Sequence, residues 1–187
     1  MQREKNTSDA FTGLEAAIVL IAFVVVAAVF AYVVLGAGFF TTQKAQETVY
    51  KSVEQSTTNL LLIGNVYGLS NNTTAGINEV KFSIGLAPGA PTVDLTKLKV
   101  VFSTPTTTPI ILTLGNSSTL AEFTAKEAGA GSSMNSMAQN QQIEIHFYVA
   151  PVPVNTPVNI EIKPGVGAAL PFSKTTPSTI TTTNVLS

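Results

Sequence analysis

The sequence predicts an α+β protein in which a long hydrophobic N-terminal α-helix precedes an antiparallel β-sandwich or barrel, including immunoglobulin-like arrangements. Three observations support this prediction. The run from Leu14 to Phe40 is almost uncharged, all ten prolines lie at or beyond Pro88, and the hydrophobic period then changes from helical to alternating. The expected division is a polar segment over residues 1–10, a helix over 11–63, a linker over 64–76 and a β domain over 77–187.

The composition excludes several classes of function. Charged residues make up 11% of the chain, against roughly 25% in ordinary soluble domains, and the net charge is -1, so no nucleic-acid partner is expected. Because cysteine is absent, the chain has no disulfide, thiolate metal site or cysteine nucleophile. A single histidine gives little capacity for acid–base chemistry near neutral pH, so no enzyme activity, cofactor or metal is expected.

The Leu14–Phe40 run has the length and polarity of a membrane-spanning helix. Glu15 is its only charge, and about 25 uncharged residues follow from Ala16, where about 20 suffice to cross a bilayer. The run is also rich in small residues, which let helix backbones approach closely. These are Ala16, Ala17, Ala22, Ala27, Ala28, Ala31, Gly36, Ala37 and Gly38. An isolated anchor gains nothing from them, so contacts with other helices are expected.

The helical pattern continues beyond the apolar run. No proline interrupts residues 41–62, and four charges recur at spacings of three or four residues, as they do on a helix surface. They are Lys44, Glu47, Lys51 and Glu54. One helix from about Leu14 to about Leu62 would be roughly 70 to 75 Å long. Such a helix exceeds the needs of one compact domain and requires partners outside its own chain.

The short polar segment before the run, residues 1–10, points to unusual processing. A secretory signal is cleaved after its apolar core, yet no convincing small-residue site follows Phe40. Cleavage ahead of the core would instead remove only residues 1–10 and keep the helix. Alternatively, residues 1–10 form the cytoplasmic tail of a bitopic protein that keeps Met1.

The segment AFTGLEAAIVLIAFVVVAAVFAYVVLGAGFF resembles the N-terminal region of archaeal flagellins (archaellins), which are similar to type IV pilins. The resemblance implies a class III signal peptide, with a 1–10 leader cut between Ala10 and Phe11 by a prepilin-peptidase-like membrane enzyme. It also places Gly13 at the third mature position and Glu15 at the fifth. The chain departs from the family pattern in one respect, because the pair SD, rather than basic residues, precedes the cut.

Glu15 has two interpretations. A carboxylate at the edge of the hydrocarbon costs several kcal/mol unless it is paired or near the interface. After cleavage, the new amino group of Phe11 would pair with Glu15 of the same or a neighbouring subunit. Alternatively, Glu15 lies in the first helical turn, where the helix dipole and headgroup water both favour a carboxylate. The sequence leaves both interpretations open.

Short segments of alternating hydrophobicity follow the linker. Val80–Leu86 places apolar residues at every second position, as a half-buried strand does. Further strands are expected at Val93–Leu95, Lys97–Phe102, Ile110–Leu114, Gln142–Ala150 and Val158–Lys163. Clusters of proline, glycine and asparagine separate them. Within the longest gap, LAEFTAKEAG is compatible with a short helix and AGSSMNSMAQNQ with an exposed loop.

The β region offers candidate modification sites but no catalytic pattern. Asn71, Asn72 and Asn116 fit the N-x-[ST] pattern in expected loops and are candidate N-glycosylation sites. Glu144 and His146 lie two residues apart on one strand and so share a face, but no further ligand or motif accompanies them. An ordinary surface strand is the preferred interpretation of this pair.

The resemblance implies a structural subunit of the archaeal flagellum (archaellum). The precursor would lie in the cytoplasmic membrane and then polymerise with its own copies, or with paralogous subunits, into an extracellular filament for swimming motility. A separate cytoplasmic ATPase and a membrane platform would drive assembly. Two alternatives remain. One is an adhesive type IV pilus-like subunit, and the other is a bitopic membrane-anchored surface protein whose β domain binds a ligand or glycan.

Overall fold

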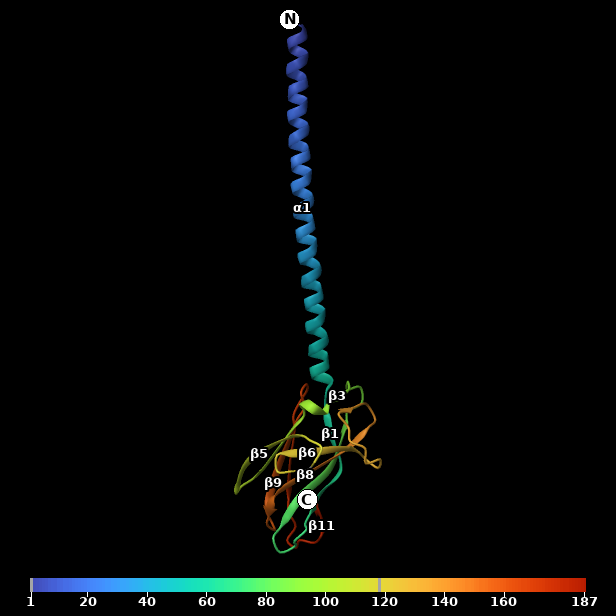
Figure 1. Ribbon diagram of the computed structural model, residues 1–187, viewed down its shortest axis with the longest axis vertical. Coiled ribbons are helices and arrows are strands. Elements are labelled where there is room, and N and C mark those ends of the chain that lie inside the picture. The colour runs from blue at the N-terminus through green and yellow to red at the C-terminus, as the bar shows by residue number, and fades with distance from the viewer. Residues whose placement is uncertain (1, 118) are drawn as a thin grey trace. The chain divides into compact units, whose positions relative to one another are not determined.

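The computed structural model describes residues 2–117 and 119–187, and their side chains from Thr12 onward. The chain divides into two compact units: the helix unit ends at Tyr50 and the β unit begins at Lys51. Helix α1 (Gln2–Thr57) is followed by strands and one short 3-10 helix, η1 (Leu95–Lys97) (Figure 1). The strands are β1 (Leu60–Leu69), β2 (Ile77–Leu86), β3 (Val93–Asp94), β4 (Lys99–Thr104), β5 (Thr107–Leu114), β6 (Glu122–Glu127), β7 (Ser136–Met137), β8 (Gln142–Val152), β9 (Pro157–Lys163), β10 (Leu170–Thr175) and β11 (Thr183–Leu186).

Helix α1 is continuous because nothing in its sequence interrupts it. It contains no proline, and the hydroxyl groups of several threonines donate to the carbonyl four residues earlier, which satisfies them locally. These bonds run from Thr41 to Ala37 (2.8 Å), from Thr42 to Gly38 (2.9 Å) and from Thr48 to Lys44 (2.8 Å). Within the described residues, the Thr12–Thr57 part of α1 is the one helix long and apolar enough to cross a membrane.

The helix ends earlier than the sequence predicts. At its end, the N–H and Oγ1 of Thr58 both donate to the Glu54 carbonyl (3.0 and 2.7 Å). Leu60 is then buried, with 2% exposure, opposite Leu86 of β2. Burial in a sheet outweighs the helical preference of the LLLI segment, so the predicted boundaries of the helix (11–63), linker (64–76) and β domain (77–187) are wrong. The loop between β1 and β2 covers only residues 70–76.

Nine strands form one sheet in the order β10-β9-β4-β5-β6-β8-β2-β1-β11, and β3 pairs with β7 in a separate two-stranded sheet. Neighbours in the large sheet are antiparallel except for β5 and β6. The two ends of the sheet meet where the Thr175 N–H donates to the Ser187 carbonyl (2.7 Å) and the Ser187 N–H to the Thr175 carbonyl (3.3 Å). The sheet is therefore an almost closed barrel, and the predicted α+β fold is confirmed.

Most predicted strands are present, but three of the segments considered above differ from expectation. β2, β4, β5, β8 and β9 each overlap a predicted strand, whereas Val93–Leu95 divides between β3 and η1. LAEFTAKEAG is not a helix, because β6 runs through it between β5 and β8 with Phe123 and Ala125 buried. The expected loop AGSSMNSMAQNQ contains β7, whose Met137 is fully buried. In LAEFTAKEAG and AGSSMNSMAQNQ, pairing with other strands therefore determines the secondary structure.

Aromatic rings link strands that are distant in the chain across the barrel interior. Three ring pairs meet edge to face, the geometry that aromatic quadrupoles favour. They are Phe82 with Phe147 (6.3 Å between centroids), Phe82 with Phe172 (5.4 Å) and Phe102 with Phe147 (5.9 Å). Because these residues come from β2, β4, β8 and β10, the cluster joins both halves of the sheet. The β unit therefore has a core of its own.

Truncating the central ring should destabilise the β unit. Phe147→Ala removes a side chain with 0% exposure and should lower the free energy of unfolding by about 3–5 kcal/mol. Val185→Ala, at a residue that is 49% exposed on β11, is the control and should change it by less than about 1 kcal/mol. Chemical denaturation of the detergent-solubilised chain, followed by tyrosine fluorescence, measures both. Equal, small losses in the two variants would contradict the assigned core.

Candidate functional site

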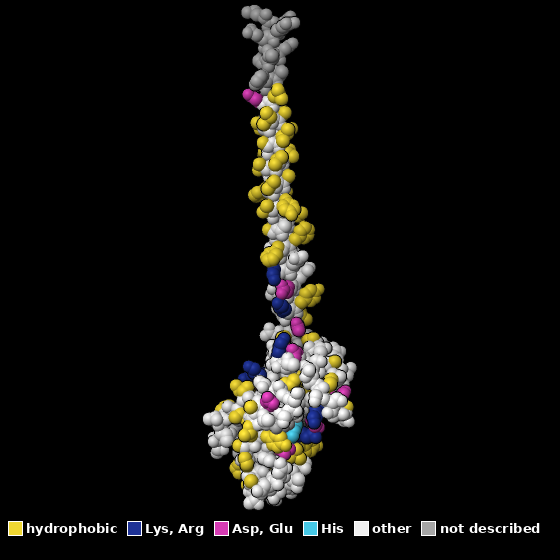
Figure 2. Space-filling view, in the orientation of Figure 1, with side chains coloured by type: hydrophobic (Ala, Val, Ile, Leu, Met, Phe, Trp, Pro, Cys, Tyr) yellow, Lys and Arg dark blue, Asp and Glu magenta, His cyan; other side chains and the backbone are white. Residues whose placement is uncertain are grey.

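The surface of the helix unit is the candidate functional site. All side chains of α1 that the structure describes are exposed, including Phe23 (73%), Phe30 (71%) and Tyr32 (79%). Figure 2 shows apolar side chains along this helix down to a lower region that carries basic and acidic groups. Soluble monomers rarely expose a contiguous apolar patch larger than a few hundred Å². This surface therefore belongs against lipid or against other protein chains.

One side of the helix is lined by small residues. Ala27, Ala31 and Gly38 follow one another at spacings of four and seven residues, which places them on one face. They lie in a shallow groove together with Phe30, Val34, Leu35, Phe39 and Thr42. A Cβ at Gly38 would meet nothing within 4 Å in its own chain, although glycine costs a helix about 1 kcal/mol relative to alanine. A second helix packed in this groove would account for the glycine.

The small residues of this helix do not all lie on one face. Gly36 and Gly38 are two residues apart and so point to different sides of the helix. The helical period of 3.6 residues, applied to the whole run, would have separated Ala27, Ala31 and Gly38 from Gly36.

The expected leader junction lies at the limit of what the structure describes. Met1 and the side chains of Ala10 and Phe11 are outside the described part. Gly13 and Glu15 are exposed on α1. The Glu15 side chain lines a shallow hollow with Thr12, Ala16, Val19, Leu20 and Phe23. This places its carboxylate at the N-terminal end of the apolar surface.

The three candidate glycosylation residues are exposed in loops of the β unit. Asn71 and Asn72 lie in the 70–76 loop, and Asn116 follows β5. The Nδ2 of Asn71 donates to Glu79 Oε1 (3.0 Å), and the Oδ1 of Asn72 accepts the backbone N–H two residues later (3.1 Å). The third residue of the Asn116 pattern, Ser118, lies outside the described residues.

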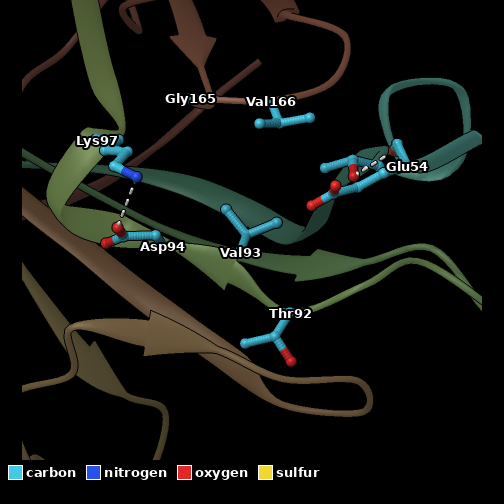
Figure 3. Close-up of a pocket in the computed structure, with 8 residues that line it drawn as sticks. Glu54, Thr92, Val93, Asp94, Lys97, Gly165 and Val166 are labelled. Carbon is cyan, nitrogen blue, oxygen red and sulfur yellow. Dashed lines mark hydrogen bonds and ion pairs between the residues drawn. The ribbon is translucent and has the colours of Figure 1, made fainter. Parts of the chain in front are cut away.

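A notch of about 130 Å³ lies in the β unit beside the last turn of α1. Figure 3 shows two of its lining residues, Asp94 and Lys97, facing one another at 3.6 Å between Oδ2 and Nζ. Asp94 caps η1, and its Oδ1 accepts the hydroxyl (2.6 Å) and the N–H (2.9 Å) of Thr96, which hold the pKa of Asp94 below its usual range. Ligand sites usually exceed about 300 Å³. The notch is smaller than that.

Glu144 and His146 share one face of β8 but contact different partners on β2. Glu144 Oε1 lies 2.9 Å from Lys81 Nζ, and His146 Nε2 lies 3.0 Å from Glu79 Oε2. Among the side chains that the structure describes, in residues 12–117 and 119–187, no group of three or more His, Asp or Glu could hold a metal ion. Lys81 and Glu144 therefore form a cross-strand ion pair, and His146 and Glu79 form a cross-strand hydrogen bond.

The fold and the exposed helix define a subunit that needs lipid or other chains around its N-terminal helix and carries a separate β unit. Residues 10–174 match the sequence model of archaeal-type flagellins. The chain belongs to the archaeal-type flagellin family, as the FTGLE segment predicted.

Similar proteins cover nearly the whole chain. "Probable flagellin 1" of Archaeoglobus fulgidus is 38% identical over 190 residues, which cover 94% of each chain. A solved structure of the archaeal flagellum of Methanospirillum hungatei strain JF1 matches with a TM-score of 0.76 and 31% identity, covering 94% of this chain and 99% of that one. Flagellin FlaB1 of Methanocaldococcus jannaschii shares the fold, with a TM-score of 0.59 at 17% identity, covering 69% and 96% of the two chains.

A bulky residue on the small face should prevent close helix packing. Gly38→Leu should reduce the protein recovered in sheared, sedimentable assemblies by about tenfold, because a leucine keeps helix backbones apart. Gly36→Leu is the matched control, since a Cβ there also meets nothing within 4 Å but points elsewhere. Ultracentrifugation after shearing measures both. Equal losses would mean that the small-residue face has no special role.

Proposed function

We propose that this chain is the structural subunit of an archaeal flagellum (archaellum) filament, which polymerises through α1 and serves swimming motility. The observation that carries the proposal is the apolar surface of α1, whose described side chains are all exposed. Membership of the archaeal-type flagellin family supports it. The similarity over nearly the full length to a chain of the Methanospirillum hungatei flagellum supports assembly of copies into an extracellular filament.

Before assembly, the precursor lies in the cytoplasmic membrane. The Leu14–Phe40 run is about 40 Å long as a helix, which exceeds the roughly 30 Å hydrocarbon core. A prepilin-peptidase-like membrane enzyme then removes residues 1–10, cutting between Ala10 and Phe11 so that Gly13 becomes the third residue. The FTGLE segment and a family match that begins at residue 10 support this cleavage.

In the filament, α1 helices from many copies, or from paralogous subunits, pack at the centre, and the β units form the outer wall. Lipid and a helix bundle remove the same apolar surface from water. Close backbone contact at the small residues must therefore supply the specificity with which the helices pack on one another. Glu15 is stabilised there by the new amino group of Phe11 or by the positive end of the helix dipole. A cytoplasmic ATPase and a membrane platform supply the energy for assembly.

The β unit has a structural role and no enzymatic activity or cofactor. Asp94 pairs with Lys97 in the notch, and Glu144 and His146 of β8 contact Lys81 and Glu79 of β2, which supports a structural role. Asn71, Asn72 and Asn116 are exposed and offer N-glycosylation sites on the filament surface.

The mature N-terminus distinguishes a filament subunit from a bitopic surface protein. Peptide mass spectrometry should find that protein sheared from the cell surface begins at Phe11, because the cut precedes the apolar core. The membrane pellet, analysed in parallel, should contain some uncut precursor. Protein confined to the pellet and still beginning at Met1 would show that α1 is an anchor and that no filament forms.

Deletion of the subunit distinguishes swimming from adhesion. Cells lacking the chain should lose surface filaments and directed swimming, and a plasmid copy should restore both. An adhesive pilus subunit shares the helix and the processing, so its deletion would remove filaments and surface attachment but leave swimming unchanged. Tracking of single cells in liquid, together with electron microscopy of the same culture, measures both properties.

A further inference from the structure

Strand β5 is paired along its whole length on one side only. β4 pairs with it from Thr107 to Thr113, whereas β6 pairs only with Thr113 and Leu114. Among the residues that the structure describes, no strand is hydrogen-bonded to the rest of this second edge, Thr107–Leu112. We call this segment the open β5 edge. In Figure 1, the β4–β5 hairpin extends away from the other strands of the β unit.

The paired end of β5 shows which backbone groups face the open edge. The Thr113 N–H points toward β6, because it donates to a carbonyl just before that strand (3.1 Å). Alternate residues of a strand point the same way, so the Ile111 N–H faces this edge too. Pro109 has no N–H, and the Thr107 N–H donates to Thr104 Oγ1 (3.1 Å). Ile111 therefore supplies the N–H that remains on the edge.

Large apolar side chains accompany this edge. Ile111 is 60% exposed in the middle of the strand, while Leu112 next to it is fully buried. Leu120, in the connection to β6, is also 60% exposed. A partner that covered Ile111 would remove apolar surface from water and accept its N–H at the same place. Pro109 prevents a long added strand, so side-chain contact with a short backbone bridge fits this edge best.

The absence of charge on β5 favours a copy of the same chain as the partner. The strand reads TTPIILTL and contains no charged residue. Soluble proteins usually protect a free edge with lysine or other charges. The proposed polymerisation places copies of this chain beside each subunit, and an edge without charge meets no like-charge repulsion from any surface of a copy.

We propose that the open β5 edge, with Ile111 at its centre, contacts the β unit of a neighbouring copy in the filament. The inference rests on the proposed polymerisation and adds to it a second interface, outside the helix. Because a filament is an open-ended assembly, the contact is head to tail, and the edge meets a different surface of the neighbour. Ile111 is then buried in the filament and exposed in the free subunit.

Single cysteines test the contact directly, because the chain contains none of its own. Ile111→Cys should react with a charged maleimide at least about tenfold more slowly in intact filaments than in detergent-dissociated subunits. Val154→Cys, at a residue that is 43% exposed between β8 and β9, is the matched control. For each variant, protection is the reaction rate in dissociated subunits divided by the rate in intact filaments. The measured quantity is the protection of Ile111→Cys divided by that of Val154→Cys. A quotient near one overturns the proposal.

A charge placed on the edge tests the same contact by stability. Ile111→Lys should lower the temperature at which filaments dissociate, because every β5 contact would then bury a lysine. Filaments of Val154→Lys should dissociate at the same temperature as filaments of the unmodified chain. Equal dissociation temperatures for the two variants overturn the proposal. Filaments that form normally, but in which Ile111→Cys reacts with the maleimide as fast as in dissociated subunits, refute only the β5 contact. Failure of the unmodified chain to form filaments refutes the proposed function itself.

Discussion

The structure depends on one constraint: the apolar surface of α1 has no cover of its own. The side chains from Leu14 to Phe40 are exposed, so the helix is stable only in lipid or against other helices. Both environments remove that surface from water, so the hydrophobic effect alone does not favour one over the other. Any difference in free energy between the helix in lipid and the helix packed against other helices must come from contacts that lipid cannot make. The chief such contact is close backbone approach along the face of Ala27, Ala31 and Gly38.

The same constraint explains why the β unit contains a complete core. A domain carried by a helix whose own surface must be covered by lipid or other chains cannot rely on that helix for stability. The β unit instead closes its sheet through Thr175 and Ser187 and joins β2, β4, β8 and β10 through a cluster of phenylalanine rings. Its surface ion pairs, such as Lys81 with Glu144, are partly exposed and contribute at most about 1 kcal/mol each. Burial in the barrel therefore supplies most of the stability.

The sequence predicted the elements that a local pattern defines and missed those that pairing defines. The uncharged run after Glu15 could only be a long helix, and the alternation in Val80–Leu86 could only be a half-buried strand. LLLIGNVYGL suits either state, and the burial of Leu60 decides it. LAEFTAKEAG contains good helix formers, yet it lies between two strands and becomes β6. At the candidate site, motifs predicted the leader and the sequons, but the exposure of Ile111 depends on which strands are neighbours.

The open β5 edge follows from the connectivity of the sheet. β5 and β6 are parallel but are joined only by residues 115–121, whereas parallel neighbours usually need about a dozen or more connecting residues. Because so short a connection cannot return to the start of β5, β6 begins beside its end, with Thr113 opposite Glu122, and continues past it. Gly115 permits this arrangement, since a Cβ there would collide with the Glu122 side chain. The barrel's strand order thus leaves the Thr107–Leu112 edge of β5 without a partner strand, whatever residues it contains, and the uncharged sequence of β5 then determines what can approach this edge.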